Sequence, residues 1–487
     1  MKIHMIGHAS LFIETKDCRI LIDPVFWDPF YEDRNETCPK REVIIENLPE
    51  FDFLVISHSH LDHFDIRTLA HLPKTVDVLI PQDKLIENYL LKLGYSQIYA
   101  LKDFDEVRIG STNLQTTRSE NRVPEFGIVV SDDSGTFWNQ VDTDVSSTTI
   151  SKILSKYSKV DFLLATWQPM LEACYQLNQS ISFPYIAYSQ LLYKISLIQP
   201  QGIAPGANGF KYVDDAAWLN QIAFPVTREK FCQDIQEMIP KLGENIFALD
   251  PGDILTFCGS DFSYSPAACN YVKKLDDNRD SIVFVPVKAG NKLTDSNCKK
   301  SDIDDIKKEI KQEITFDFPK FIEQHLTELF LEHQKWKVIY QLEVIFADES
   351  ISQWFIDFSK EKITTYQGFN PLANFFSYTT ASHLYGRLKG ALGSEYTMDS
   401  GCYRSYQKVY SVNSLGFVYP AAMNVSIEDP LLLRFSNLFK EKKSNPVLDR
   451  AVEKWSNAIT KEPSRAKTNN SMLKFEGVLL KPTKRTK

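Results

Sequence analysis

Short apolar segments separated by turn residues dominate the first 60 positions of the chain. Residues 2–6, 10–15 and 19–22 are rich in β-branched and aromatic side chains, and Gly, Asp and Pro lie between them. This pattern predicts β-strands. A further apolar run, 53–56, has the length of a strand and stops at the polar stretch 57–65. We therefore expect this strand to end in a polar loop.

Farther along the chain, strand-like and helix-like segments alternate. The pattern predicts strands at 76–80, 97–101, 106–109, 126–130, 136–140 and 162–165, and helices at 66–72, 83–93 and 147–156. Such alternation is typical of a layered α/β protein.

The composition changes after residue 257, which we take as the end of a first domain, 1–257. Residues 258–302 are rich in Ser, Asp, Asn and Lys and indicate a connection. Helix-like and strand-like segments return in 303–460, which predicts a smaller C-terminal α+β domain. The tail 461–487 holds eight Lys/Arg and two Glu, and we expect a basic, flexible end to the chain.

The overall composition is that of a globular protein. The chain has 487 residues, 55 of them basic and 63 acidic, and its net charge of −8 disfavours general nucleic-acid binding. Eight cysteines form no C-x-x-C pair, which argues against a zinc finger, an iron–sulfur cluster and a disulfide scaffold. No segment approaches the ~18–20 apolar residues of a membrane span, and we see no signal peptide. A cytoplasmic protein with free thiols is expected.

The strongest chemical signal is the run His58-Ser59-His60-Leu61-Asp62-His63, directly after an apolar strand. Three of the nine histidines of the chain fall within these six residues. His58 and His60 lie two apart in an extended turn and can reach one metal ion. Asp62 and His63 are adjacent, so their side chains diverge and can reach a second ion. The alternative is a polar turn with a helix cap, in which the histidines are incidental.

This run resembles the H-x-H-x-D-H motif of the metallo-β-lactamase superfamily. The resemblance implies an αββα sandwich in residues 1–257 and a dinuclear metal site. Gly7-His8-Ala9-Ser10 resembles the opening hairpin of that fold. Asp23 would then brace a metal-bound histidine. Asp142 would bridge the two metals, although Val141 stands where that superfamily has glycine.

The departures from this pattern favour a particular chemistry. No histidine occurs between His71 and His325, so the third and fifth histidine positions of a typical hydrolytic member are not filled in the usual way. Glu120 occupies the third position and Glu125 is the alternative, while Asn208 is at best a weak ligand at the fifth. A set of two histidines and a carboxylate is typical of non-haem iron. We therefore expect two iron ions, with zinc or manganese as alternatives.

Within the superfamily, residues 3–257 are most similar to the metal domain of the CMP-N-acetylneuraminate hydroxylase family. Its relatives include di-iron enzymes that oxidise the amine of an amino acid. The segments that carry the likeness are Ile56-Ser57-His58, Asn139-Gln140-Val141-Asp142 and Asp250-Pro251-Gly252-Asp253. The printed sequence has neither a Rieske Cys/His signature nor a G-x-G-x-x-G fingerprint. Electrons for dioxygen would then come from an external donor or from the substrate.

Other side chains remain open to two interpretations. His8 either lines the site or is a structural histidine. Arg118 and Arg122 flank Glu120 and either bind a substrate carboxylate or are solvated. His383 is either a distant ligand from the second domain or a core residue, which we favour.

These observations predict a non-haem di-iron oxygenase that uses O2 to oxidise a small amine or amino-acid-like substrate. His58, His60 and Glu120 would hold one iron, Asp62 and His63 the other, and Asp142 both. Asp62, Glu120 and Asp142 are the expected catalytic carboxylates. The alternative is a zinc-dependent hydrolase of a phosphoester, lactone or amide. A non-catalytic protein with a degraded site is disfavoured by the complete His/Asp motif.

Overall fold

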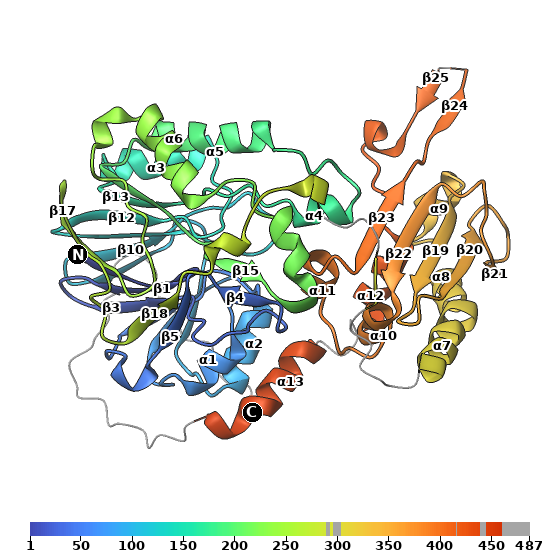
Figure 1. The fold of residues 1–487 in the computed structure, drawn as a ribbon, viewed down its shortest axis with the longest axis horizontal. Helices are drawn as coiled ribbons and strands as arrows, with labels where there is room; N and C mark the ends of the chain where they lie inside the picture. Colours follow the sequence, from blue (N-terminus) through green and yellow to red (C-terminus); the bar gives the residue numbers. More distant parts are fainter. Residues whose placement is uncertain (289–292, 296–302, 415, 439–444, 460–487) are drawn as a thin grey trace.

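The computed structural model describes residues 1–288, 293–295, 303–414, 416–438 and 445–459. An N-terminal layered domain and a smaller C-terminal domain lie side by side, as Figure 1 shows. No helix among these residues is long and apolar enough to cross a lipid bilayer.

Two sheets face each other in the N-terminal domain. The larger sheet runs antiparallel through its first hairpins and becomes parallel from β3 onward. Its order is β17 (Asp261–Ser265), β16 (Ile254–Cys258), β1 (Lys2–Gly7), β2 (Ser10–Glu14), β3 (Arg19–Ile22), β6 (Phe53–Val55), β7 (Asp77–Pro81) and β8 (Ile98–Leu101). The smaller sheet has the order β14 (Gly202–Pro205), β13 (Phe162–Ala165), β12 (Gly135–Asn139), β11 (Ile128–Asp132), β10 (Thr112–Thr116) and β9 (Glu106–Ile109).

Both faces of each sheet are buried, and this explains why the strands are continuous hydrophobic runs in the sequence. Between the sheets, Ile13 and Ile20 pack in one core with Phe137 and Phe162. On the outer face of the larger sheet, Phe12 and other side chains pack with α1 (Ile66–His71) and α2 (Lys84–Lys92). The outer face of the smaller sheet is covered by α3 (Ser147–Tyr157), α5 (Tyr185–Ile198) and α6 (Arg228–Met238). The result is the predicted αββα sandwich.

Two short pairings extend this domain at its rim. They are β4 (Asn35–Thr37) with β15 (Phe210–Tyr212), and β5 (Lys40–Val43) with β18 (Val272–Asp276). Because β17 and β18 pair with strands of this domain, much of the predicted connection 258–302 belongs to it rather than to a linker.

The C-terminal domain is built on a mixed five-stranded sheet. Its order is β21 (Thr365–Gln367), β20 (Ile351–Asp357), β19 (Ile339–Ile345), β22 (Phe375–Thr380) and β23 (Tyr403–Gln407). The helices are α7 (Ile303–Gln312), α8 (Phe318–Gln324), α9 (Leu331–Lys335), α10 (Ala381–Leu388), α11 (Ser394–Asp399) and α12 (Pro430–Leu438). A hairpin of β24 (Ser411–Asn413) and β25 (Gly416–Val418) projects from it.

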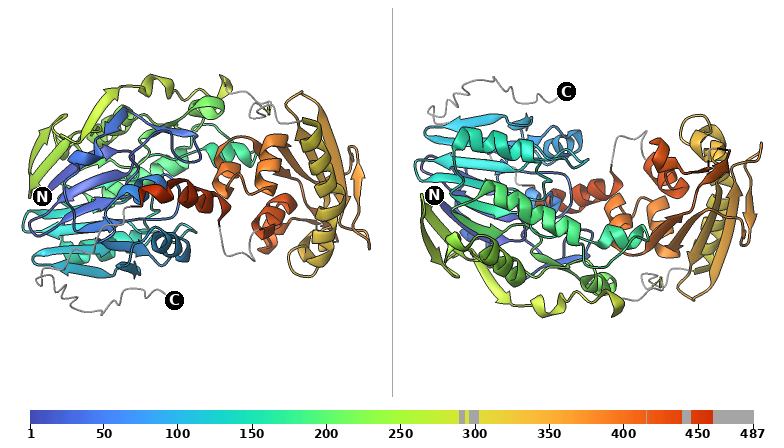
Figure 2. Two further views of the ribbon diagram at one scale, coloured as in Figure 1. Left: turned by 90° about the horizontal axis from the view of Figure 1, so that it is seen from below. Right: turned by 90° about the horizontal axis from the view of Figure 1, so that it is seen from above.

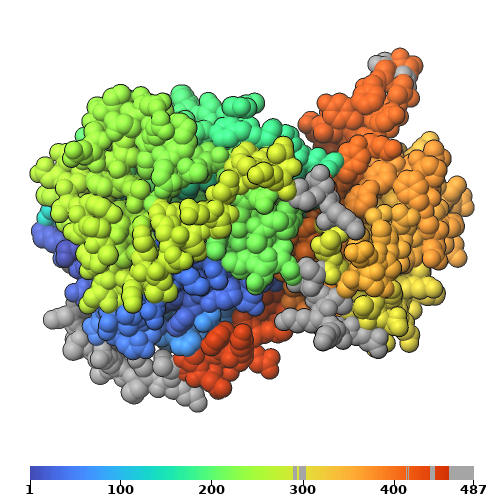
Figure 3. Space-filling model, in the orientation of Figure 1, coloured from blue at the N-terminus to red at the C-terminus, as the bar shows by residue number. Residues whose placement is uncertain are grey.

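The last described helix, α13 (Pro446–Trp455), returns to the N-terminal domain, which the predicted domain 303–460 did not anticipate. It lies against α1 and α2, as Figures 2 and 3 also show. Leu448 is part of the same core as Phe12, and the Lys92 ammonium pairs with Asp449. The tail 461–487 lies outside the described residues.

Candidate metal centre

The polar motif lies at one edge of the sandwich, where several chain segments end. His58 follows β6, and Asp142 follows β12 in the facing sheet. His8 lies in the turn between β1 and β2, and Asp23 follows β3. His8, Asp23 and Val141 all have positive φ angles, of 52°, 42° and 54°. Non-glycine residues are uncommon in this region, and strained backbone of this kind clusters at functional sites.

His58 and His60 bring ring nitrogen atoms close together. The distance from His58 Nε2 to His60 Nδ1 is 3.0 Å. Burial, together with the neighbouring His63 and His60, holds the pKa of His58 well below its usual value. A neutral imidazole is the form that binds a metal. We call His58 and His60 the first ligand set.

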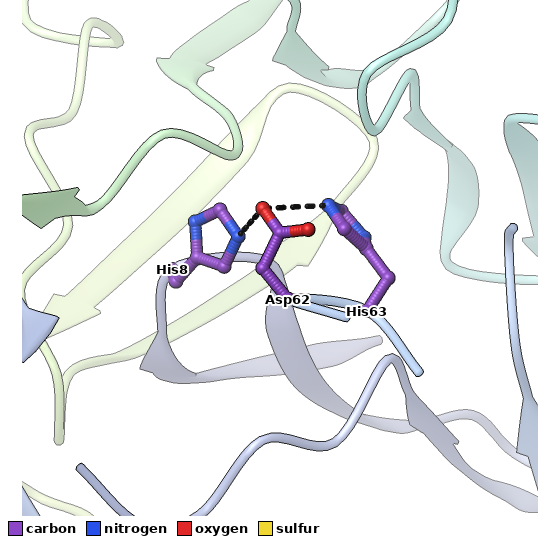
Figure 4. A group of neighbouring side chains, drawn as sticks. All are labelled: His8, Asp62 and His63. Carbon is purple, nitrogen blue, oxygen red and sulfur yellow. Dashed lines mark hydrogen bonds and ion pairs between the residues drawn. The ribbon is translucent and has the colours of Figure 1, made fainter. Parts of the chain in front are cut away.

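His8, Asp62 and His63 form a second ligand set, drawn in Figure 4. Asp62 Oδ2 lies 3.1 Å from His8 Nε2 and 3.7 Å from His63 Nε2. All three side chains are buried. His8 thus joins the motif from a turn about fifty residues earlier, and two imidazoles and a carboxylate each direct one ligand atom at the same place.

Asp142 lies between the two ligand sets. Its Oδ2 is 3.0 Å from His63 Nε2, and it groups closely with His58 and His63. Its other oxygen, Oδ1, is buried and has no hydrogen-bond partner among the described residues. Burial would raise the pKa of Asp142, but His63 holds it at about 2, so the side chain is a carboxylate. An ionised carboxylate with a free buried oxygen suits a metal bridge.

Asp23 fixes the orientation of His63, as the resemblance implied for a bracing carboxylate. It is 0% exposed; its Oδ2 lies 2.9 Å from His63 Nδ1 and also accepts a hydrogen bond from the Ser57 hydroxyl. Its Oδ1 accepts a hydrogen bond from the Ser57 N–H. Holding Nδ1 in this way directs His63 Nε2 toward Asp62 and Asp142.

Replacing Asp23 with asparagine is expected to weaken metal binding about 10–100-fold, the usual effect of losing such a partner. The amide can accept fewer of the three hydrogen bonds that Asp23 receives. Competition with a chromophoric chelator measures the affinity. Asp133→Asn, an exposed site paired with Lys16, serves as control. Equal affinities for D23N and D133N would contradict the bracing role.

The two glutamates that could supply the third-position ligand have different surroundings. Glu120 is ion-paired with Arg118 and belongs to neither ligand set. Glu125 is 8% exposed, and burial raises its pKa to about 7. Asn121 Nδ2 donates to both Glu125 Oε1, at 2.7 Å, and the Asp142 carbonyl, at 3.2 Å.

The backbone places Glu125 beside the first ligand set. The N–H of Phe126 donates to the Ser57 carbonyl, next to His58. The charges of Asp142 and His63 also act on the Glu125 carboxyl group. Glu125 is therefore buried in the loop next to His58, although neither it nor Glu120 belongs to the two groups of converging ligand atoms among the described residues.

His8 lies beside the loop in which the resemblance would place the fifth histidine. The loop that carries Asn208 and Gly209 packs on the β1–β2 turn. A Cβ at Gly209 would lie 3.0 Å from His8 Cα, so this close approach requires glycine. Asn208 has a φ of 67°, typical of a turn, and belongs to neither ligand set. Sequence spacing could not reveal this proximity, because His8 is distant along the chain.

The C-terminal domain also reaches the motif, which the sequence did not predict. Glu395 Oε2 on α11 accepts a hydrogen bond of 3.2 Å from the Leu61 N–H, within the motif itself. Asp399, at the end of α11, accepts a hydrogen bond of 2.7 Å from the Tyr31 hydroxyl. His383, in contrast, is a core residue that hydrogen-bonds Thr379 and Thr397.

Comparisons with known proteins agree with this architecture. Residues 2–145 match the family model described as beta-lactamase superfamily domain. A Mycobacterium tuberculosis protein, named for a Rieske 2Fe-2S iron-sulfur centre, is 28% identical over 35% of this chain and 36% of its own length. The chain therefore matches only about a third of that curated relative.

Two solved structures are similar over about half of the chain. The isothiocyanate hydrolase from Delia radicum gut bacteria is 18% identical, with a TM-score of 0.40, and covers 53% of this chain and 99% of its own. CmlA, a diiron beta-hydroxylase from Streptomyces venezuelae, is 16% identical, with a TM-score of 0.37, and covers 54% of each chain. Residues 2–145 thus match a beta-lactamase superfamily domain, and the sandwich built around the motif has the layers of the metallo-β-lactamase fold.

Proposed function

We propose that the chain is a non-haem di-iron oxygenase that uses dioxygen to oxidise a small amine or amino-acid-like substrate. The first ligand set with Glu125 would hold one iron, the second ligand set the other, and Asp142 both. A pair of iron ions bound there would supply the capacity to bind and reduce dioxygen.

The proposal depends mainly on the kind of side chain that lies near His58 and His60. Near His58 and His60 the described residues offer the carboxylates of Asp142 and Glu125, while the neighbouring imidazole of His63 would serve the second ligand set. Two histidines and one carboxylate form the ligand set that many non-haem iron enzymes use. Asp142 adds a second carboxylate on this side, which further favours a hard metal ion.

The electrons for the reaction would come from an external donor or from the substrate. The mycobacterial relative is named for a Rieske iron–sulfur centre, and such clusters transfer single electrons. A redox partner of that kind is consistent with the proposal.

A zinc-dependent hydrolase remains the second candidate because of His8. With His8, the second ligand set holds two imidazoles and one carboxylate, a set that catalytic zinc sites use as well as iron sites. Three protein ligands plus a water molecule form the usual catalytic zinc site. The substrate would then be a phosphoester, lactone or amide.

Metal analysis combined with oxygen uptake tests the proposal. We expect the protein from iron-supplemented cells to retain about two iron ions per chain. With a reductant and a panel of amines and amino acids, at least one substrate should consume O2 and yield a product labelled from 18O2. Zinc-loaded protein is the control and should consume none. Turnover of an ester or phosphodiester by the zinc form, without oxygen uptake by the iron form, would overturn the oxygenase proposal.

A further inference from the structure

The hairpin of β24 and β25 stands clear of the C-terminal domain with an exposed apolar face (Figure 1). The two strands form a separate two-stranded sheet, in which Val412 lies opposite Phe417. The ring centre of Phe417 lies 4.9 Å from that of Tyr410 and 6.1 Å from that of Tyr419. These four side chains, which are 47–68% exposed, are called the hairpin face. An isolated two-stranded ribbon is marginally stable in water, so this face needs a partner to pack on.

The helix α5 exposes a second apolar surface. Its inner side covers the smaller sheet, where Tyr188 and Ile195 are buried. Its outer side carries Tyr185, Ile186 and Tyr193, which are 76%, 77% and 57% exposed. We call these three side chains the α5 face. A contiguous apolar surface of this kind marks an interaction site.

The two faces lie on the same side of the molecule, at the top of Figure 1. Contacts within the chain join the segments that carry them. The helix α4 (Glu172–Gln176), which precedes α5, contacts β23, which precedes the hairpin. Arg404 on β23 donates a hydrogen bond to Asn178 Oδ1, between α4 and α5. A single partner could therefore meet both faces.

The charges of the two segments favour a second copy of this chain as that partner. Residues 173–213 and 400–427 contain no Asp or Glu, although the chain has 63 among 487 residues. Two copies with a net charge of −8 repel each other, so they can meet only where carboxylates are absent. The same segments hold four Lys/Arg, of which Lys194 pairs with Asp144 and Lys408 lies over an aromatic ring. So few cations make a poor surface for anionic lipid or nucleic acid.

The exposed area is large enough for a stable pair of copies. The five aromatic side chains of the two faces are 47–76% exposed. At about 150–250 Å² for each aromatic side chain, the two faces offer roughly 800 Å² per copy, or about 1,600 Å² in a pair. Specific protein interfaces bury about 1,200–2,000 Å² in total.

We propose that two copies of the chain associate by placing the hairpin face of each on the α5 face of the other. A twofold axis makes this contact twice, because both copies carry the same two surfaces. The pair supports a ribbon that nothing covers among the described residues of the single chain. The inference is independent of the proposed function, since neither face belongs to the metal centre.

Sedimentation velocity of the full-length protein over a micromolar concentration series tests the association. The wild-type protein is expected to form a dimer. Phe417→Lys and Ile186→Glu should each weaken it about tenfold or more, because each buries an unpaired charge in the contact. Phe316→Lys is the control, since Phe316 is 64% exposed in the segment between α7 and α8, outside both faces. F316K should dimerise as the wild type does.

Mixing the two variants tests the reciprocal contact. In a mixed pair, one contact joins the opposite charges introduced by F417K and I186E, and the other keeps both original side chains. The mixture should therefore associate more tightly than either variant alone. A mixture no tighter than its components, a wild-type protein that stays monomeric, or unchanged association of F417K would overturn the proposal. Binding of monomeric protein to phosphatidylcholine vesicles that is lost in F417K would identify a lipid surface as the occupant and would also overturn it.

Discussion

Replacing Asp142 with alanine is expected to reduce the bound metal from a pair of ions to one or fewer per chain. The carboxylate lies 3.0 Å from His63 Nε2, and its second oxygen is buried without a partner. Loss of a residue that hydrogen-bonds a metal ligand usually lowers metal affinity about 10–100-fold. Loss of Asp142, which would bind both ions directly, should lower it more than about 100-fold. Oxygen uptake should fall to about 1% of wild type or less, because the two ions no longer share a ligand. Metal analysis after gel filtration measures the first effect, and an oxygen electrode measures the second.

Asp144→Ala is the matched control. Asp144 lies two residues away, is exposed, and pairs with Lys194 rather than with the histidines. D144A should retain both ions and near-normal uptake. A D142A protein that keeps two tightly bound ions would exclude Asp142 as the bridge.

The second large effect is expected at Glu125. Glu125→Gln should weaken metal binding at the first ligand set about 100-fold, because an amide replaces a charged ligand. Glu120→Gln should change it little, since Glu120 is paired with Arg118 at the surface. Each variant replaces a carboxylate with an amide, and the two positions lie in the same loop. A larger loss for E120Q than for E125Q would restore Glu120 as the ligand.

A second measurement separates metal binding from folding. The pKa of Glu125 is raised to about 7, chiefly by burial. The folded, metal-free protein therefore binds this proton more tightly than the unfolded chain. This tighter proton binding stabilises the folded protein. The stabilisation is complete below the unfolded pKa of about 4.5 and is lost as the pH rises through about 7. At pH 8, metal-free E125Q should melt at a higher temperature than wild type, although it binds metal more weakly.

The fold and the central motif could be predicted because their signals are local. Strands such as β1, β2 and β6 appear as short apolar runs, and the motif from His58 to His63 stands out by density alone. The resemblance to the superfamily, itself carried by short segments, implied Asp142. These features depend on neighbouring residues, which a sequence records directly.

The remaining parts of the site depend on contacts between distant segments. His8 reaches the second ligand set only because β1 and β6 belong to one sheet. Glu395 and Asp399 reach the N-terminal domain only when the two domains pack together. The choice between Glu120 and Glu125 depends on side-chain orientation in an irregular loop, where Arg118 holds one and Asn121 the other. No periodicity encodes any of these contacts.

The return of α13 to the N-terminal domain means that the second domain is anchored at both of its ends. The chain leaves the sandwich after β18 and comes back through Leu448, so α11 cannot swing away on a single hinge. A movement of the second domain against the sandwich would therefore have to bend both connections at once. Deleting the chain from residue 446 onward should remove this second anchor and expose Glu395 and Asp399 on α11 to water.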